Sequence, residues 1–244
     1  MKITVCGDSI TKGVIFDEAK GRYTFMKDSG MKTLQAMLQA VIKNVSKFGC
    51  TTEKGQDILQ KNKAHIAESD YTILEYGGND CDMPWDAIAE NPDGVYGANV
   101  PEEQFEQNYG RMIEETQELG SIPVLMSLPP LDQDRFYRWV SALAEKKNAD
   151  AKANILKYLN GNTETIYLWQ QNYNTAVLRL AEKYHLPLID IRKAFLEQED
   201  YKDLISIDGM HPNQKGQDLI AKTASDFFQR FCGRPESKKQ TTAA

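Results

Sequence analysis

The feature that most constrains the fold of this chain is an alternation along its length. Short apolar runs, rich in Ile, Val and Leu, are separated by longer segments with helical periodicity. The runs cover residues 2–6, 44–48, 71–76, 122–127 and 186–189. Mostly continuous apolar runs are typical of strands that are covered by helices on both faces. The alternation therefore predicts an α/β fold: a three-layer α/β/α sandwich around a five-stranded parallel sheet.

Helices are expected between the strands, because apolar residues recur there at helical spacing. One such series runs from Met31 through Leu34 and Leu38 to Val41 and Ile42. Further helices are predicted around residues 57–66, 105–119 and 219–231, and a long helical region over 132–183 with a break near residues 160–161.

Composition narrows the class of protein. The chain has 244 residues and a net charge of −6, and an acidic protein gains nothing from phosphate attraction, so we expect no nucleic-acid partner. No apolar run is long enough to cross a bilayer, which predicts no membrane insertion. The four cysteines match neither a zinc pattern nor a disulfide framework, and no leader segment is recognised, so a cytoplasmic location is predicted. The oligomeric state stays open.

Polar and glycine residues follow the predicted strands where each one ends. Ser9 follows the first strand, Gly49 the second and Asn79 the third, while Asp208 and His211 precede the last helix. Because the carboxyl ends of parallel strands share one edge of the sheet, we expect these residues to meet there.

These residue types together supply the groups that serine acyl transfer requires. Ser9 is the candidate nucleophile, His211 its base and Asp208 the partner that orients the histidine ring. The backbone N–H groups of Ser9 and Gly49 and the amide of Asn79 are candidate oxyanion donors. Read singly, each has a plainer interpretation: Ser9 and Asn79 as turn or cap residues, and His211 as an ordinary loop residue.

The same blocks carry a family resemblance. Gly7-Asp8-Ser9, Gly49, Gly77 to Asp80 and Asp208 to Pro212 resemble the conserved blocks of the SGNH hydrolases, also called GDSL esterases and lipases. The resemblance spans residues 1–232. It implies a flavodoxin-like sheet, the catalytic residues Ser9, Asp208 and His211, and the oxyanion donors Ser9, Gly49 and Asn79, with no metal and no cofactor.

The chain departs from this family pattern in two long insertions, at about residues 81–100 and 131–165. We predict one domain over 1–232, with a polar tail at 233–244. Glu75, Trp85, Phe136 and Trp139 are candidate substrate-binding residues. Each also has a structural alternative: Glu75 as a buried hydrogen-bonding group, and the aromatic residues as small cores beneath the insertions.

The sequence thus predicts a serine esterase that acts on a small-molecule ester with a short acyl group, and an acetylated carbohydrate is one candidate substrate. Hydrolysis of a lysophospholipid or a thioester is the alternative within the same family. A non-catalytic flavodoxin-like binding module is the rival from a different class, although the chain contains no glycine-rich nucleotide-binding motif that would support it.

Overall fold

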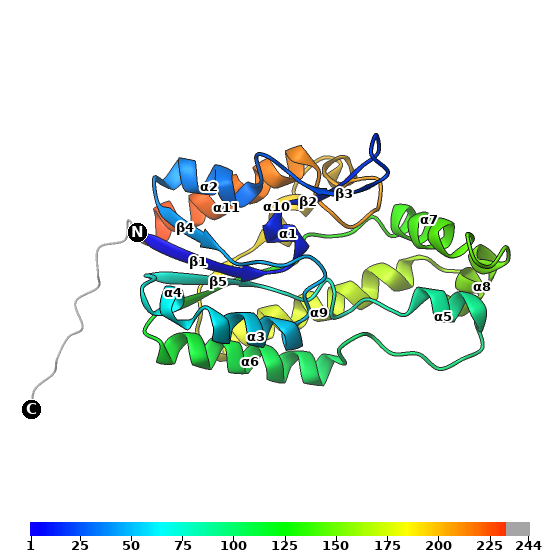
Figure 1. Cartoon of the computed structure of the whole chain (residues 1–244), viewed down its shortest axis with the longest axis horizontal. Coiled ribbons are helices and arrows are strands. Elements are labelled where there is room, and N and C mark those ends of the chain that lie inside the picture. Colours follow the sequence, from blue (N-terminus) through cyan, green and yellow to red (C-terminus); the bar gives the residue numbers. More distant parts are fainter. Residues whose placement is uncertain (233–244) are drawn as a thin grey trace, which may run out of the picture.

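The computed structural model describes residues 1–232. Its main sheet has five parallel strands in the order β4-β1-β5-β6-β7, and helices cover both faces (Figure 1). The strands are β1 (Lys2–Gly7), β4 (Val41–Asn44), β5 (Tyr71–Glu75), β6 (Ile122–Met126) and β7 (Leu188–Ile189). The predicted α/β/α sandwich is therefore confirmed. The predicted tail at 233–244 lies outside the described residues.

Consecutive residues of the central strands are buried on opposite faces of the sheet. Cys6 and Leu74 belong to the apolar cluster under one layer of helices, whereas Val5 and Ile73 belong to the cluster under the other. The first layer contains α3 (Thr52–Lys61), α4 (Lys63–Ala67), α6 (Glu102–Glu118) and α9 (Glu164–Lys183). The second contains α2 (Gly30–Leu38), α10 (Ile191–Leu196) and α11 (Gln214–Cys232). Within residues 1–232, no helix is both long and apolar enough to cross a membrane.

The strand order places the carboxyl ends of β1 and β5 next to each other at the centre of the sheet. In chain order the sheet reads second, first, third, fourth, fifth, which is the flavodoxin-like order. The order reverses between β1 and β5, and open α/β sheets bind ligands beside such a reversal, at the carboxyl ends of the strands. Ser9 follows β1 and Asn79 follows β5, so both residues lie at this position.

The second strand of the main sheet, counted along the chain, differs from the prediction. It is β4, Val41–Asn44, and not 44–48, so Val41 and Ile42 belong to a strand and not to the preceding helix. Helix α2 ends at Leu38, and Gln39 takes a left-handed conformation with φ 49°. The β-branched pair Val41-Ile42 favours the pleated conformation, which the periodicity alone did not reveal.

Two helical regions are also more broken than predicted. The helix expected over 57–66 forms two helices, α3 and α4, which meet at Asn62. The long region over 132–183 contains α7 (Gln133–Ala144), α8 (Ala151–Tyr158) and α9, so a second break separates α7 from α8. A hairpin of β2 (Val14–Asp17) and β3 (Arg22–Phe25) was not predicted.

The two insertions pack against each other at the carboxyl end of the sheet (Figure 1). The first contributes α5 (Trp85–Glu90), and the second contributes α7 and α8. Apolar side chains of these helices and of the beginning of α9 form a third cluster of buried residues, which includes Ile88, Phe136 and Ile155. The insertions therefore share an apolar core of their own beside the strand ends.

Candidate active site

Ser9 lies in a tight turn that directly follows β1. Asp8 caps the short helix α1 (Ser9–Lys12), and its Oδ1 accepts a backbone N–H from that helix at 2.8 Å. Gly7 has no room for a side chain, because a Cβ there would lie 2.3 Å from the Thr11 hydroxyl oxygen. The turn brings the Ser9 side chain, which is 5% exposed, to the edge of the sheet.

The ring of His211 lies between Ser9 and Asp208. Its Nε2 is 2.9 Å from Ser9 Oγ, and its Nδ1 is 2.6 Å from Asp208 Oδ2. Asp208 Oδ1 accepts the backbone N–H groups of Met210 and His211, each at 3.0 Å. The structure thus brings together the three residues that the sequence singles out for serine chemistry.

The surroundings of Asp208 favour its charged form. Burial opposes ionisation of this carboxyl group, but the hydrogen bond and charge of His211 and the two backbone N–H donors outweigh burial and hold the pKa of Asp208 below its usual value. An ionised Asp208 accepts a hydrogen bond from the Nδ1–H group, which leaves Nε2 unprotonated and free to take the proton of Ser9. This arrangement is able to activate a serine hydroxyl as a nucleophile.

Asn79 lines the same pocket as Ser9 and His211. Its side-chain Nδ2 donates to Asp8 Oδ2 at 2.9 Å and, over a longer distance of 3.3 Å, to the carbonyl oxygen of Cys50. Asp8 was not singled out from the sequence, although its place inside the Gly-Asp-Ser motif was a signal for it. The amide of Asn79 is therefore held beside Ser9 by a buried carboxyl group.

Gly49, the third candidate oxyanion donor, lies in the turn after β4. Its φ of 66° is in the left-handed region, and a Cβ at this position would meet no other atom within 4 Å. The residue is therefore required for its backbone conformation, and the space beside it is open. The following residue, Cys50, provides the carbonyl group that accepts the second N–H of Asn79.

Glu75 lies fully buried at the floor of the pocket, near Asp8. Its Oε2 accepts the Thr11 hydroxyl at 3.3 Å, while Oε1 has no hydrogen-bond partner among the described residues. Burial raises the pKa of Glu75 well above its ordinary value, and the charge of Asp8 raises it further; burial also raises the pKa of Asp8. The two carboxyl groups are thus expected to hold one proton at neutral pH. We expect that proton on Glu75, because Asp8 accepts the N–H groups of Ile10 and Asn79, and because burial and the charge of Asp8 both raise the pKa of Glu75.

This pair makes stability depend on pH. Above the ordinary pKa of glutamate, the unfolded chain releases the proton of Glu75 whereas the folded chain retains it, so the free energy of unfolding falls as pH rises. Glu75→Gln keeps a neutral hydrogen-bonding group of the same shape. Because glutamine does not ionise, this variant does not lose stability through residue 75 as pH rises. Between about pH 6 and about pH 8, we expect the wild type to lose stability relative to the variant, by at most about 1.4 kcal/mol per pH unit. Urea denaturation of both proteins across this range measures the difference. Parallel pH profiles would contradict a protonated Glu75.

The aromatic candidates divide between two adjoining pockets. Trp85 and Phe136 line the Ser9 pocket, together with Glu75. Trp139 lines a second, shallower pocket with Tyr23, and that pocket also contains Trp85 and Phe136 in its walls. The structure therefore places three of the four candidate substrate-binding residues in the Ser9 pocket, and the fourth, Trp139, in the adjoining pocket.

Two parts of the site were missed in the sequence. Gln170 of α9 lines the Ser9 pocket, where its side chain donates to the Pro129 carbonyl group at 2.7 Å. Tyr23, in the unpredicted β2–β3 hairpin, packs edge-on against the His211 ring, with 5.3 Å between the ring centroids. Gln170 interrupts the apolar stripe of α9, which was a signal for it in the sequence. The hairpin gave no such signal for Tyr23.

The cysteines and the remaining carboxyl group beside the site have structural environments. Asp80 Oδ1 accepts the backbone N–H and the hydroxyl of Thr52, at 2.9 and 2.6 Å, which braces the Asn79 loop. Cys50 and Cys81 are buried free thiols, and burial raises the pKa of Cys50 to about 12, so neither is an activated thiolate. Residues 1–232 hold no cluster of three metal-ligating side chains.

Comparisons with known proteins identify the family of the chain. The model of the GDSL-like lipase/acylhydrolase family matches residues 5–219. The GDSL esterase/lipase CPRD49 of Arabidopsis thaliana is 24% identical over 178 residues, which cover 71% of this chain and 60% of that protein. The chain thus spans less than two thirds of the length of this relative.

Solved structures of the same fold include two enzymes. The lipase/acylhydrolase from Enterococcus faecalis superposes with a TM-score of 0.66 at 20% identity, covering 94% of this chain and 96% of that one. A variant of Axe2, an acetyl-xylooligosaccharide esterase from Geobacillus, gives a TM-score of 0.63 at 16% identity, covering 96% and 94%. Because the family model spans most of the sequence, the chain belongs to the GDSL-like lipase/acylhydrolase family.

Proposed function

We propose that the protein hydrolyses esters of short carboxylic acids through an acyl-enzyme formed on Ser9, with His211 as base and Asp208 as its partner. The observation that carries this proposal is the chain of contacts from Asp208 Oδ2 through the His211 ring to Ser9 Oγ, with distances of 2.6 and 2.9 Å, at the wall of a pocket. Within this reading, residues 1–232 act as one catalytic domain.

Acylation begins when Ser9 Oγ attacks the carbonyl carbon of the ester and its proton passes to His211 Nε2. The carbonyl oxygen becomes an oxyanion, which the Asn79 amide and the N–H groups of Ser9 and Gly49 stabilise. When the tetrahedral intermediate collapses, the bond to the alcohol oxygen breaks. His211 then returns its proton to that oxygen, and the alcohol leaves.

Deacylation follows the same route with water as the nucleophile. His211 Nε2 takes a proton from water, and the hydroxide attacks the carbonyl carbon of the acyl-serine. The second tetrahedral intermediate releases the carboxylic acid, and Ser9 recovers its proton from His211. Throughout both steps Asp208 stays ionised and stabilises the imidazolium form of the ring.

The walls of the pocket favour a short acyl group. The empty volume of about 710 Å³ includes its open mouth, and aromatic side chains of Trp85, Phe136 and Trp169 surround it. The buried carboxyl group of Glu75 lies among them, and its Oε1 has no hydrogen-bond partner among the described residues. A long alkyl chain would also leave this oxygen without a partner. An acetylated carbohydrate fits these features, and the acetyl-xylooligosaccharide esterase among the structural neighbours supports this choice. A lysophospholipid and a thioester are the alternative substrates for the same chemistry.

The test of the chemistry is labelling with a fluorophosphonate, which reacts with activated serines. The proposal expects one label per chain, located at Ser9 by peptide mass spectrometry. A non-catalytic binding module would remain unlabelled, and a label on another residue would place the nucleophile elsewhere. The proposed cytoplasmic location is tested separately, by following a tagged chain in fractionated cells.

The acyl preference is expected to be acetyl to butyryl. It is measured as kcat/KM on nitrophenyl esters from two to twelve carbons. Trp169→Ala should widen the pocket and move the maximum towards longer esters, because a bulky wall is removed. Trp139→Ala is the matched control, since Trp139 lines the neighbouring pocket and should leave the length profile in place. A wild-type maximum at eight carbons or above would favour a lysophospholipase.

A further inference from the structure

The second insertion packs directly against the loop that carries Asp208 and His211. The backbone N–H of Asp132, just before α7, donates to the Gly209 carbonyl group at 2.8 Å. Gly209 has a φ of 76°, and a Cβ there would lie 2.3 Å from the backbone nitrogen of Phe136. The first turn of α7 and the Asp208–His211 loop therefore touch backbone to backbone, without room for a side chain between them.

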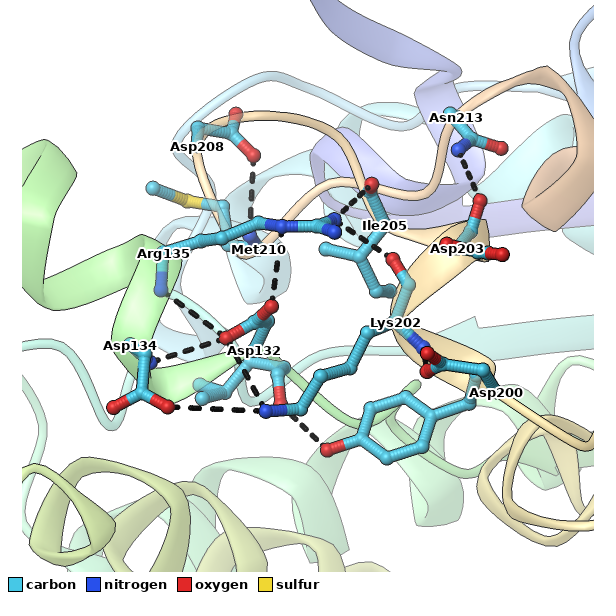
Figure 2. Close-up of polar contacts among 12 residues, drawn as sticks. Asp132, Asp134, Arg135, Asp200, Lys202, Asp203, Ile205, Asp208, Met210 and Asn213 are labelled. Atoms are coloured by element: carbon cyan, nitrogen blue, oxygen red, sulfur yellow. Dashed lines mark hydrogen bonds and ion pairs between the residues drawn. The ribbon is translucent and has the colours of Figure 1, made fainter.

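Arg135, in that first turn, reaches across to the same loop (Figure 2). Its Nη1 donates to the carbonyl oxygens of Lys202 and Ile205, at 2.7 and 2.9 Å. These carbonyl groups lie within and just after the short helix η1 (Tyr201–Leu204), at whose end the Lys202 carbonyl group also accepts the backbone N–H of Ile205. One guanidinium nitrogen thus donates to both carbonyl groups.

The guanidinium group is itself held by a buried carboxylate. Its Nε is 3.2 Å from Asp132 Oδ2, and Asp132 is 3% exposed. Asp132 Oδ1 caps α7 by accepting the N–H groups of Asp134 and Arg135, each at 3.1 Å. The Lys202 ammonium group lies 3.6 Å from the same oxygen (Figure 2). Arg135 is consequently fixed in orientation by the helix cap.

The carbonyl groups that Arg135 binds are linked to His211 by backbone hydrogen bonds. Ile205 pairs with Pro212 in an isolated bridge, and the N–H of Ser206 donates to the His211 carbonyl group at 2.8 Å. A shift of the Ile205 carbonyl is therefore passed directly to His211. The His211 ring must in turn stay 2.9 Å from Ser9 Oγ, which belongs to a different element of the fold.

We propose that Arg135 is a positioning residue: by binding the carbonyl groups of Lys202 and Ile205, it holds the histidine loop at the distance at which His211 takes the proton of Ser9. The inference rests on the proposed function of Ser9 and His211. It makes the second insertion a brace of the catalytic loop and not only a wall of the pocket. A displaced base slows proton transfer without altering the walls that bind substrate, so the effect falls on kcat.

The test compares three variants on nitrophenyl acetate. Arg135→Met keeps the apolar stem and removes every donor. Arg135→Lys keeps the charge but lacks the second nitrogen that contacts Asp132. Arg138→Met removes an exposed charge from the same helix. We expect kcat to fall about 10- to 100-fold in Arg135→Met, with KM within about twofold of wild type. Arg135→Lys should be intermediate, and Arg138→Met should match the wild type.

The outcomes separate the possible roles. If Arg135→Met lowers only the melting temperature and keeps the wild-type kcat well below that temperature, the role is structural and the proposal fails. A raised KM at unchanged kcat would make Arg135 a substrate-binding residue and would also overturn it. If Arg135→Met does not fold, a wild-type kcat in Arg135→Lys is the result against it. Absence of fluorophosphonate labelling in the wild type would instead refute the function of Ser9 itself.

Discussion

Replacing Ser9 with alanine is expected to lower kcat on nitrophenyl acetate by at least about 10³-fold and to leave the fold intact. The expected size follows from the role of the hydroxyl group: Oγ forms the bond to the acyl group, and no other nucleophile in the pocket is activated. The thiols of Cys50 and Cys81 are held protonated by burial, so they offer no substitute. Initial rates and the circular dichroism spectrum of purified variants measure the two parts of the prediction.

A matched control for this variant is Ser141→Ala. Ser141 is fully buried in α7, and its hydroxyl has no hydrogen-bond partner among the described residues. Removing it repeats the same chemical change away from Ser9, so turnover should stay at the wild-type level. A Ser9→Ala variant that retains more than about a tenth of the wild-type rate would exclude serine catalysis at this site.

The parallel sheet could be predicted because burial on both faces leaves a direct trace in sequence. Strand β5, with Ile73 and Leu74 packed against opposite helix layers, reads as a continuous apolar run. The boundary between α2 and β4 could not be placed, because Val41 and Ile42 continue the helical spacing of Met31 and Leu34 by coincidence. The turn at Gln39 depends on backbone conformation, which apolar spacing does not record.

The residues beside Ser9 could be predicted to different degrees. Ser9, Asn79, Asp208 and His211 each follow a strand or precede a helix in a recognisable block, so their meeting at one sheet edge follows from topology. The contact between Tyr23 and His211 depends on the β2–β3 hairpin, whose short strands pair only with each other and carry a weak pattern. Long-range contacts of that kind are set by packing and not by local sequence.

The polar network around Asn79 was beyond prediction for the same reason. Glu75 ends β5 and Asp8 directly follows β1, and the register of these neighbouring strands brings the two residues together, since Gly7 pairs with Glu75. Sequence identifies a carboxyl group at the end of an apolar strand, but only the register shows that it lies beside a second one. That pair, in turn, determines which groups are available to hold Asn79.

Asn79→Ala is expected to lower kcat by roughly 10²–10³, equivalent to about 3–4 kcal/mol of transition-state stabilisation, with KM little changed. The amide donates to Asp8 at 2.9 Å and to the Cys50 carbonyl group at 3.3 Å. The longer bond is the weaker one, so we expect that N–H to turn to the oxyanion while Asp8 keeps the other in place. The substrate carbonyl carries less charge than the oxyanion, and the loss therefore falls on kcat.

The neighbouring residue provides the control that separates chemistry from stability. Asp80→Ala removes the acceptor of two Thr52 donors and leaves the buried Thr52 N–H without a partner, which is expected to cost about 1–3 kcal/mol of stability. In that variant the urea midpoint should fall while kcat of the folded fraction is retained, whereas Asn79→Ala should show the reverse pattern. A rise in KM alone in Asn79→Ala would mean that the amide binds substrate and transition state equally, and it would remove Asn79 from the oxyanion site.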